Sequence, residues 1–435
     1  MHARPLHNLW WLHPTVLFGG GAIVTLAIAV STSEWGFQLY STRKYLEPWH
    51  LAMGLGAWGT YSLGVWLAMS TGREPHRPSK QLDEALVPWF WLAYLLTMVG
   101  YGIWLLVGLK NGFSLGMVRD LLQGAEQSTA DMIKNDIFPT IPGVTTSTQF
   151  GIAAVLLGTW LYCRGRTNLR LPILSLMATG TVRALIYSER LALIELVAPT
   201  VLIALRFWVL DKPQLAWRRI SLQILPLVAV PSVIVLFGLF EYFRSWQYYK
   251  DSFDSLAEFT IWRFFGYYTT AHNNGAMSMT LRGPWPIPYS TLSWFWEFPL
   301  IEDGPFGYEQ LTGIRPMMDV HLDTLERYGN PELNNDGGLF TPARDFGWIG
   351  CGPFWLVYGF LAGKAYRGFL GNSLAGCMFY PFVLLALLEL PRLQYLSATR
   401  TFPSLMLLFA LMAWLTWQEH SAAHGRSTTP APGGA

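Results

Sequence analysis

The stretch RALIYSERLALIELVAP, residues 183–199, decides how this chain folds. It places four charged residues in a run that is largely apolar from residue 171 to residue 210: Arg183, Glu189, Arg190 and Glu195. A charge costs about 2.5–3.5 kcal/mol at the centre of a bilayer. One unbroken helix over this run would be about 60 Å long, about twice the hydrocarbon core. The run therefore predicts two membrane helices that meet near residues 187–190, with the charges at the turn.

The charges at this turn have two interpretations. In the first, the arginines and glutamates pair with one another, and the turn is an ordinary salt-bridged helical hairpin. In the second, they form the rim of an intramembrane site for an anion. Both remain open from the sequence, because charges survive at membrane depth either in pairs or facing a polar cavity.

The composition indicates a polytopic membrane protein. The chain has 435 residues, of which 52% are hydrophobic and only 13% charged. Its apolar runs have the length of helices rather than of the strands of an outer-membrane barrel. A net charge of only +2 argues against a nucleic-acid partner. We expect an all-α fold in which residues 1–435 form a single transmembrane domain.

Apolar windows predict about ten transmembrane helices. They cover residues 12–31, 49–70, 86–109, 148–163, 171–188, 190–210, 221–242, 346–367, 373–390 and 399–417. The N-terminal segment has no small-residue cleavage site and is interpreted as a retained first span. Residues 420–435, which end in STTPAPGGA, are expected to form a disordered cytoplasmic tail.

Basic residues predict the orientation. They gather in the short loops on one side: Arg73, Arg77, Lys80, Arg164, Arg166, Arg170, Lys212, Arg218, Arg219, Lys364 and Arg367. The positive-inside rule makes that side cytoplasmic, with both termini. On the other side, residues 243–344 form a large loop. Ser255 and Glu258 form a capping-box pattern in it, which predicts an amphipathic helix lying along the membrane surface or over a cavity mouth.

Arginines mark the outer ends of the predicted helices, and no lysine accompanies them. We expect Arg183, Arg190, Arg244 and Arg344 to form a clamp for a diphosphate, with Arg263, Arg282 and Arg392 as further candidates. Arginine suits this ligand because its planar fork stays charged and donates in pairs. The alternative is that these arginines pair with nearby carboxylates such as Glu189, Glu195, Glu241, Asp345 and Glu389.

The candidates for acid–base chemistry are His272, Glu258 and Asp345. His272 follows a threonine pair in TTAHNNGA, and a histidine there could transfer a proton near neutral pH. Asp345 has a structural alternative, because a carboxylate at the start of a helix acts as a cap. The sequence has no D-x-D pair, no Walker A motif and no H-E-x-x-H motif, so no metal or cofactor is expected.

Aromatic residues are dense between Tyr242 and Phe346, where they alternate with asparagines. Such rings suit stacking on sugars, and the amides suit hydrogen bonds to sugar hydroxyls. An aromatic belt at the membrane interface is the alternative for any single ring.

The runs RALIYSERLALIELVAP and GNPELNNDGGLFTPARDFGWIG, residues 183–199 and 329–350, resemble the bacterial oligosaccharide repeat-unit polymerases of O-antigen and exopolysaccharide synthesis, the Wzy type. The likeness covers roughly residues 170–400. It implies a GT-C-like helical bundle in the bacterial inner membrane, with an active site facing the periplasm. It also implies a glycosyltransferase that moves a growing glycan from undecaprenyl diphosphate to a lipid-linked repeat unit, together with a possible chain-length regulator.

Two rival functions remain. An O-antigen ligase uses the same lipid-linked donor but transfers the glycan to a different acceptor. A lipid-oligosaccharide flippase performs no chemistry, and it should place its charges along a path across the bilayer. In this sequence the arginines gather on one side, with a large loop on that same side, which favours a transferase.

Overall fold

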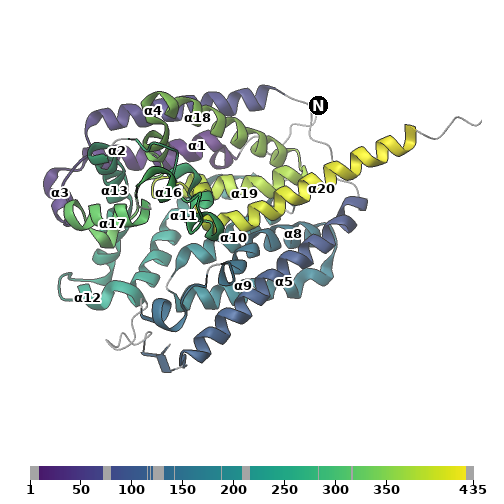
Figure 1. Ribbon diagram of the computed structural model, residues 1–435, viewed down its shortest axis with the longest axis horizontal. Helices are drawn as coiled ribbons and strands as arrows, with labels where there is room; N and C mark the ends of the chain where they lie inside the picture. Colours follow the sequence, from purple (N-terminus) through teal and green to yellow (C-terminus); the bar gives the residue numbers. More distant parts are fainter. Residues whose placement is uncertain are drawn as a thin grey trace, which may run out of the picture.

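The computed structural model describes residues 9–71, 80–114, 116–117, 119–120, 132–141, 143–187, 189–207, 216–282, 284–314 and 317–427. Every regular element among these residues is a helix. Most of the long helices run side by side in one bundle (Figure 1). The predicted all-α fold class is therefore confirmed.

Six helices in the described part of the chain are long and apolar enough to cross a membrane. They are Pro14–Ser31, Gln81–Lys110, Thr167–Ile186, Ile220–Tyr249, Thr341–Leu370 and Thr399–Ser421. Their lengths and compositions are those of an α-helical, multi-pass membrane protein.

The other predicted spans are also helical, but most of them are shorter. Helix α4 covers Pro48–Ser70, α8 covers Gly151–Cys163, α10 covers Arg190–Leu205 and α19 covers Leu374–Glu389. A 16-residue helix such as α10 is only about 24 Å long. Residues 151–161 of α8 are all buried, so this helix belongs to the centre of the bundle.

The break predicted at the charged turn is confirmed. Helix α9, Arg170–Ile186, ends just before it, and α10 begins at Arg190. The amide of Glu189 donates to the carbonyl of Ala184 at 2.9 Å, which closes the last turn of α9. The two helices therefore meet with their charged residues at one end of the bundle.

Helix α13, Leu256–Arg282, differs from the expected surface helix. It starts as the capping box predicts, because the amide of Glu258 donates to Ser255 Oγ at 3.2 Å. Its second half is not amphipathic, however, since residues 271–278 are all buried. It packs against α2, Val24–Ser31, and α11, Ala216–Glu241. Much of the predicted outer loop is therefore part of the bundle.

The two ends of the bundle carry different parts of the chain. Helices α3, Glu34–Gln38, α12, Gln247–Tyr249, and α17, Met317–Tyr328, lie at the left of Figure 1, near α13. The free end of α20, Phe402–Ser427, lies at the right. The tail expected to be disordered from residue 420 is thus helical as far as Ser427, and residues 428–435 lie outside the described residues.

Arginines at the right-hand end close the last turns of helices. Arg206 donates from Nε to the carbonyl of Phe369 at 2.9 Å and from Nη2 to that of Leu370 at 3.1 Å. These carbonyls end α18, Thr341–Leu370. Arg367 donates from Nη1 to the carbonyls of Ala68 and Thr71 in the same way, at the end of α4. These two side chains satisfy carbonyls that a helix leaves without partners.

Candidate functional site

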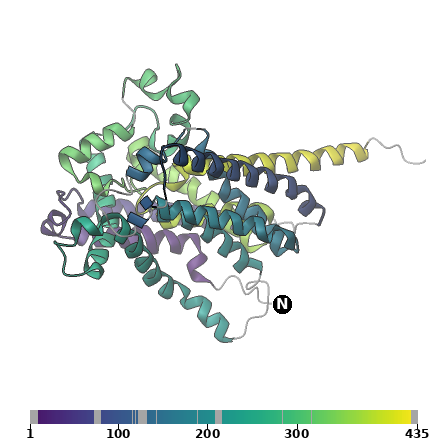
Figure 2. The ribbon, with the colours of Figure 1, turned by 90° about the horizontal axis from the view of Figure 1, so that it is seen from below.

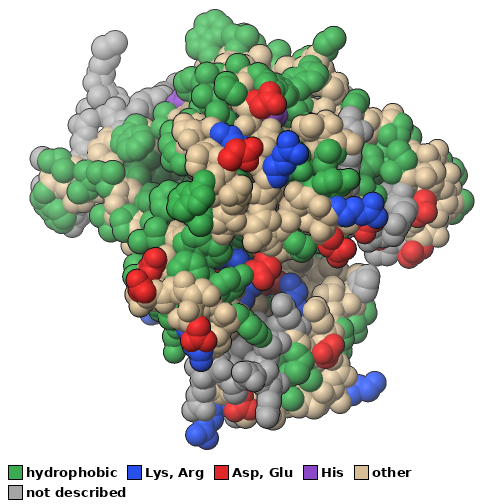
Figure 3. Space-filling view, turned by 90° about the vertical axis from the view of Figure 1, so that its left-hand side faces the viewer, with side chains coloured by type: hydrophobic (Ala, Val, Ile, Leu, Met, Phe, Trp, Pro, Cys, Tyr) green, Lys and Arg blue, Asp and Glu red, His purple; other side chains and the backbone are tan. Residues whose placement is uncertain are grey.

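The arginines singled out by the sequence lie at the left-hand end of the bundle. Figure 3 looks onto this end: acidic and basic side chains lie across its middle, some of them set back in a hollow, and apolar side chains are frequent towards its edges. The structure divides the candidate arginines into separate groups.

Three guanidinium groups surround the ring of Tyr267 on α13. Arg244 Nη1 donates to the tyrosine hydroxyl at 3.4 Å. The guanidinium carbons of Arg190 and Arg392 lie 4.8 Å and 5.0 Å from the ring centroid. We call Tyr267, Arg190, Arg244 and Arg392 the Tyr267 cluster. Through these contacts, Tyr267 on α13 touches residues from three other parts of the chain: α10, the turn after α11, and the loop between α19 and α20.

The cluster changes the acidity of its tyrosine. Burial on its own raises the pKa of Tyr267, but the charges of Arg244, Arg190 and Arg392 outweigh it and hold the pKa below its usual value. The neighbouring Tyr268 is also buried, and burial together with the Glu389 carboxylate raises its pKa. The three arginines therefore make the Tyr267 hydroxyl easier to ionise than an ordinary tyrosine.

Carboxylates form ion pairs with two arginines of the Tyr267 cluster and with Arg263 on α13. Arg190 Nη1 lies 3.1 Å from Oε1 of Glu241, whose side chain is completely buried. Arg263 Nε lies 3.6 Å from the other oxygen of Glu241. Arg392 Nη1 lies 2.7 Å from Glu389 Oε2. The alternative interpretation, in which arginines pair with carboxylates, thus holds for Arg190, Arg263 and Arg392.

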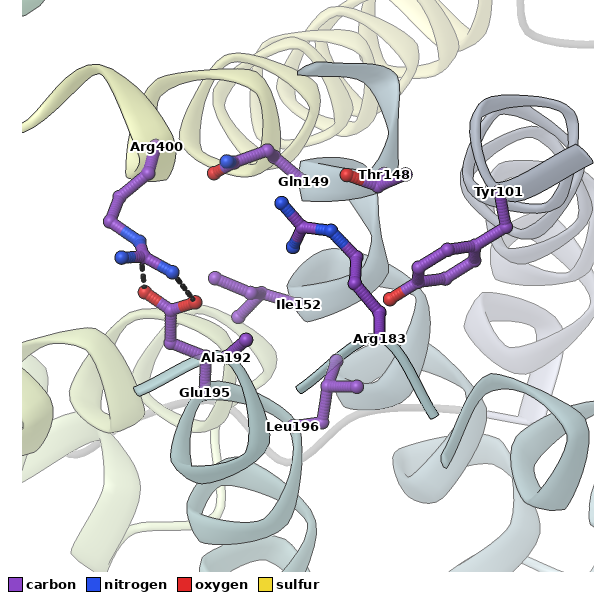
Figure 4. A pocket seen from close by; sticks show the side chains of 9 residues that line it. All are labelled: Tyr101, Thr148, Gln149, Ile152, Arg183, Ala192, Glu195, Leu196 and Arg400. Atoms are coloured by element: carbon purple, nitrogen blue, oxygen red, sulfur yellow. Dashed lines mark hydrogen bonds and ion pairs between the residues drawn. The ribbon is translucent and has the colours of Figure 1, made fainter. Parts of the chain in front are cut away.

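A small cavity lies beside the charged turn (Figure 4). Its polar lining comes from Tyr101, Thr148, Gln149, Arg183, Glu195 and Arg400. Arg400 binds Glu195 with two contacts, Nε to Oε1 at 2.7 Å and Nη2 to Oε2 at 2.8 Å. The cavity volume available to the centre of a water molecule is about 20 Å³. This is enough for one or two waters but not for a sugar.

Arg183 is the charged group in this cavity that forms no ion pair with a carboxylate among the described residues; its guanidinium carbon lies 4.9 Å from the ring centroid of Tyr187. Figure 4 shows its guanidinium pointing towards Gln149 and Arg400, with no interaction drawn to the other lining residues. Within the described residues, no carboxylate lies within 4.0 Å of it. The other three charges of the turn pair with residues outside it: Glu189 with Lys134, Arg190 with Glu241 and Glu195 with Arg400. Three of the four charges at the turn are therefore in salt bridges, as the first interpretation expects but with partners outside the turn, and Arg183 lines the cavity.

The loop between α19 and α20 links the cavity to the Tyr267 cluster, because it carries both Arg400 and Arg392. Two glycines of the GNPELNNDGGLF run let another loop approach it. Gly337 has φ +66° and donates its amide to the carbonyl of Arg392 at 2.9 Å. A Cβ on Gly338 would lie 2.3 Å from the carbonyl carbon of Leu393. These positions require glycine to hold the Arg392 loop in place.

Arg344 does not join the other arginines in the predicted clamp. Its Nη2 atom lies 2.5 Å from Oδ2 of Asp336, eight residues earlier in the chain. Burial disfavours the charged form of Asp336, but Arg344 outweighs that effect and lowers the pKa of this carboxyl. The expected four-arginine clamp is therefore wrong in this respect. Arg282 lies at the end of α13, and its side chain is outside the described residues.

The three acid–base candidates also lie apart from the arginines. Asp345 accepts hydrogen bonds from the amides of Tyr289, Ser290 and Thr291 and from Thr291 Oγ1, so it anchors a distant loop instead of capping its own helix. His272 is fully buried, with Nε2 2.9 Å from Thr25 Oγ1, and burial lowers its pKa to about 3. Glu258 is exposed and accepts from the amide of Asp254 at the start of α13.

Several aromatic residues of the 243–344 region pack on one another. Tyr289 and Tyr308 lie 4.7 Å apart between ring centroids, and Trp296 lies 5.1 Å from Tyr308. All three are buried, so in this structure they do not present open faces to a sugar.

The sequence pattern did not single out Tyr267 or Gln149 as site residues. Tyr267 had a local signal, since it lies one helical turn after Arg263 on α13. Gln149 had none, because its position in the cavity beside Arg183 depends on the packing of separate helices. Comparison of the chain with protein families, with curated proteins and with solved structures found no match.

Proposed function

We propose that this chain is a Wzy-type polysaccharide polymerase of the bacterial inner membrane. It transfers a growing glycan from undecaprenyl diphosphate to a lipid-linked repeat unit on the periplasmic face. The observation that carries the proposal is Arg183, a guanidinium without a carboxylate partner among the described residues, which faces a cavity beside Arg400. Arg183 is half-buried, and a charge close to the membrane is stabilised when an anion joins it.

The proposed topology has ten spans with both termini in the cytoplasm. The six long apolar helices account for part of that count, and α4, α8, α10 and α19 supply the rest. The left-hand end in Figure 1 then faces the periplasm, and the capped helix ends with Arg206 and Arg367 face the cytoplasm. This orientation follows the positive-inside rule.

The proposed reaction needs positioning and charge stabilisation. The acceptor hydroxyl oxygen attacks the anomeric carbon of the donor, and the bond from that carbon to the diphosphate oxygen breaks. The electron pair stays on the departing diphosphate, whose growing charge Arg183 and the Tyr267 cluster stabilise. The hydroxyl proton passes to a base. Because the cavity holds only one or two waters, the bundle opens before the lipid-linked donor binds.

An O-antigen ligase is the second candidate, since it uses the same lipid-linked donor and would also need arginines to stabilise the departing diphosphate. A flippase is disfavoured because the arginines of the cavity and the Tyr267 cluster gather at one end of the bundle. A chain-length regulator is the expected partner of a polymerase, and the lipid bilayer is the expected solvent of the apolar helices.

The deciding experiment uses the purified full-length chain in nanodiscs with lipid-linked repeat units, in EDTA and without nucleotide. A ladder of longer glycans on a gel supports the polymerase, and unchanged single units contradict it. Transfer of preformed long chains to a lipid core instead identifies the ligase.

The sharpest variant is Arg183→Gln, because no buried carboxylate among the described residues loses its partner. We expect elongation to fall by about 10²–10³-fold, the usual loss for one group that stabilises developing charge. Arg166→Gln is the matched control, since Arg166 is exposed and lies 3.5 Å from the exposed Glu84. Equal activity in the two variants would remove Arg183 from the site.

A further inference from the structure

Residues 292–306 form an apolar segment that leaves the bundle. It contains two short helices, α14, Ser293–Trp296, and α15, Pro299–Glu302. The segment is seen at the top of Figure 2, in green, where it extends away from the long helices. Its exposed side chains are large and apolar: Leu300 is 81% exposed, Phe306 69%, Phe298 40%, Phe295 38% and Leu292 38%. Such a patch on a protein surface marks an interaction site.

The segment is attached to the first turn of α20. The rings of Trp294 and Phe402 are stacked, with centroids 4.5 Å apart, and Phe298 lies 6.2 Å from Phe402. Ser293 Oγ also donates to the carbonyl of Ser397 at 2.5 Å, just before that helix. These contacts fix the base of the segment and leave Leu300 and Phe306 pointing outwards.

Phe402 belongs to an apolar side of α20. Met406 and Phe409 follow it at spacings that place all three residues on one helix face. Met406 is 52% exposed and Phe409 is 62% exposed. Both lie in Thr399–Ser421, one of the helices able to cross a membrane. The segment therefore sits at the end of an exposed apolar stripe, and on a helix that crosses a membrane such a stripe faces lipid.

We propose that residues 292–306 form an interfacial segment, which inserts Leu300 and Phe306 into the boundary between the headgroups and acyl chains of the bilayer. The inference depends on the membrane-spanning role of α20 and not on the polymerase activity. The exposed Glu302 and Asp303 face the water above this boundary. Because these neighbours are acidic, burial of apolar surface drives the insertion, and anionic lipid is not needed.

The test places a cysteine at one position at a time and attaches an environment-sensitive fluorophore. Cys163 is replaced by serine first, since the other two native cysteines are buried. The protein is placed in nanodiscs that hold one copy each, made of phosphatidylcholine with a nitroxide near the headgroup end of the acyl chain. Leu300→Cys and Phe306→Cys are the variants, and Asp303→Cys is the control from the same segment.

We expect a blue-shifted emission and loss of fluorescence at positions 300 and 306, with little change at 303. Unquenched emission at both 300 and 306 would overturn the proposal, as would equal quenching at all three positions. Fluorescence that shifts only when several copies share one disc would also overturn it, because a second copy would then cover the segment. Two labelled positions keep the result clear if one variant fails to fold.

Discussion

Arg190 Nη1 lies 3.1 Å from Oε1 of Glu241, a carboxylate with no exposed surface. Replacing Arg190 by alanine leaves that charge buried and without its closest partner, which typically destabilises a protein by about 3–5 kcal/mol. We therefore expect Arg190→Ala to lower the unfolding temperature in detergent and to abolish polymer together.

The double variant Arg190→Met with Glu241→Gln separates the two effects, because it removes the charge of both partners. A stable double variant that still makes no polymer keeps Arg190 in the site. Recovery of polymer along with stability would reduce Arg190 to a structural role.

Tyr267 is expected to ionise first among the chain's tyrosines, because three guanidinium groups hold its pKa below the usual value despite its burial. The measurement is absorbance near 295 nm during a pH titration. Tyr267→Phe should remove the earliest phase of tyrosinate formation. Tyr268→Phe is the matched control, since burial raises the pKa of Tyr268, and identical curves for the two variants would contradict the prediction.

Asp345 is expected to matter for stability rather than for proton transfer. It accepts three amide hydrogen bonds and one from a hydroxyl, and each buried donor left without a partner costs about 1–3 kcal/mol. Asp345→Ala should therefore unfold at a much lower temperature, with Thr291→Val showing a smaller effect. An Asp345→Asn variant that is as stable as the parent but makes no polymer would show that Asp345 acts in the chemistry.

Gly338→Ala should displace the loop that carries Arg392. The new methyl group would meet three backbone atoms of Leu393 and Gln394 at 2.3–2.5 Å, and backbone cannot move aside as a flexible side chain does. We expect a loss of about 1–3 kcal/mol in stability and a marked fall in elongation. Gly352→Ala has open space around its Cβ, so it should leave both measurements unchanged.

Glu297 should make its own contribution to the pH dependence of stability between pH 4.5 and pH 7. Burial, together with the charge of Glu302, raises the pKa of Glu297 from 4.5 to about 7. In this window the folded state keeps a proton on Glu297 that the unfolded state releases, so this contribution to the free energy of unfolding decreases as pH rises and levels off above pH 7. Buried His272, whose pKa is lowered to about 3, contributes the opposite slope below pH 6.5. The Glu297 slope is therefore the difference between the unfolding temperatures of the parent and of Glu297→Gln, measured from pH 5 to pH 8. Glu297→Gln should abolish it, and Glu302→Gln should only reduce it, whereas a slope unchanged in Glu297→Gln would contradict the assignment.

The features that sequence could predict are those that depend on near neighbours. Charges within an apolar run located the break before Arg190, and Ser255 with Glu258 located the start of α13. Near neighbours in the sequence did not indicate that the second half of α13 is buried inside the bundle. Its Asn273 and Asn274 are among the asparagines whose amides suit sugar hydroxyls, but these amides donate to backbone carbonyls of Arg43 and Leu333, far away in the chain.

The candidate site shows the same limit. A run of arginines at helix ends predicted where positive charge gathers, and Arg190, Arg244 and Arg392 do meet at Tyr267. Which arginine keeps a carboxylate and which faces a cavity depends on how α9, α10 and α20 pack. Arg344 and Asp336 are close in sequence, yet Asp336 is not among the carboxylates that the sequence offers as partners of the arginines.

The engagement of Arg206 and Arg367 with the last carbonyls of α18 and α4 gives two cations a packing role. In the proposed orientation both side chains lie at the cytoplasmic end of the bundle, where the positive-inside rule expects basic residues. Exchanging them for acidic residues would therefore remove positive charge from that end and also leave the last carbonyls of both helices without these donors.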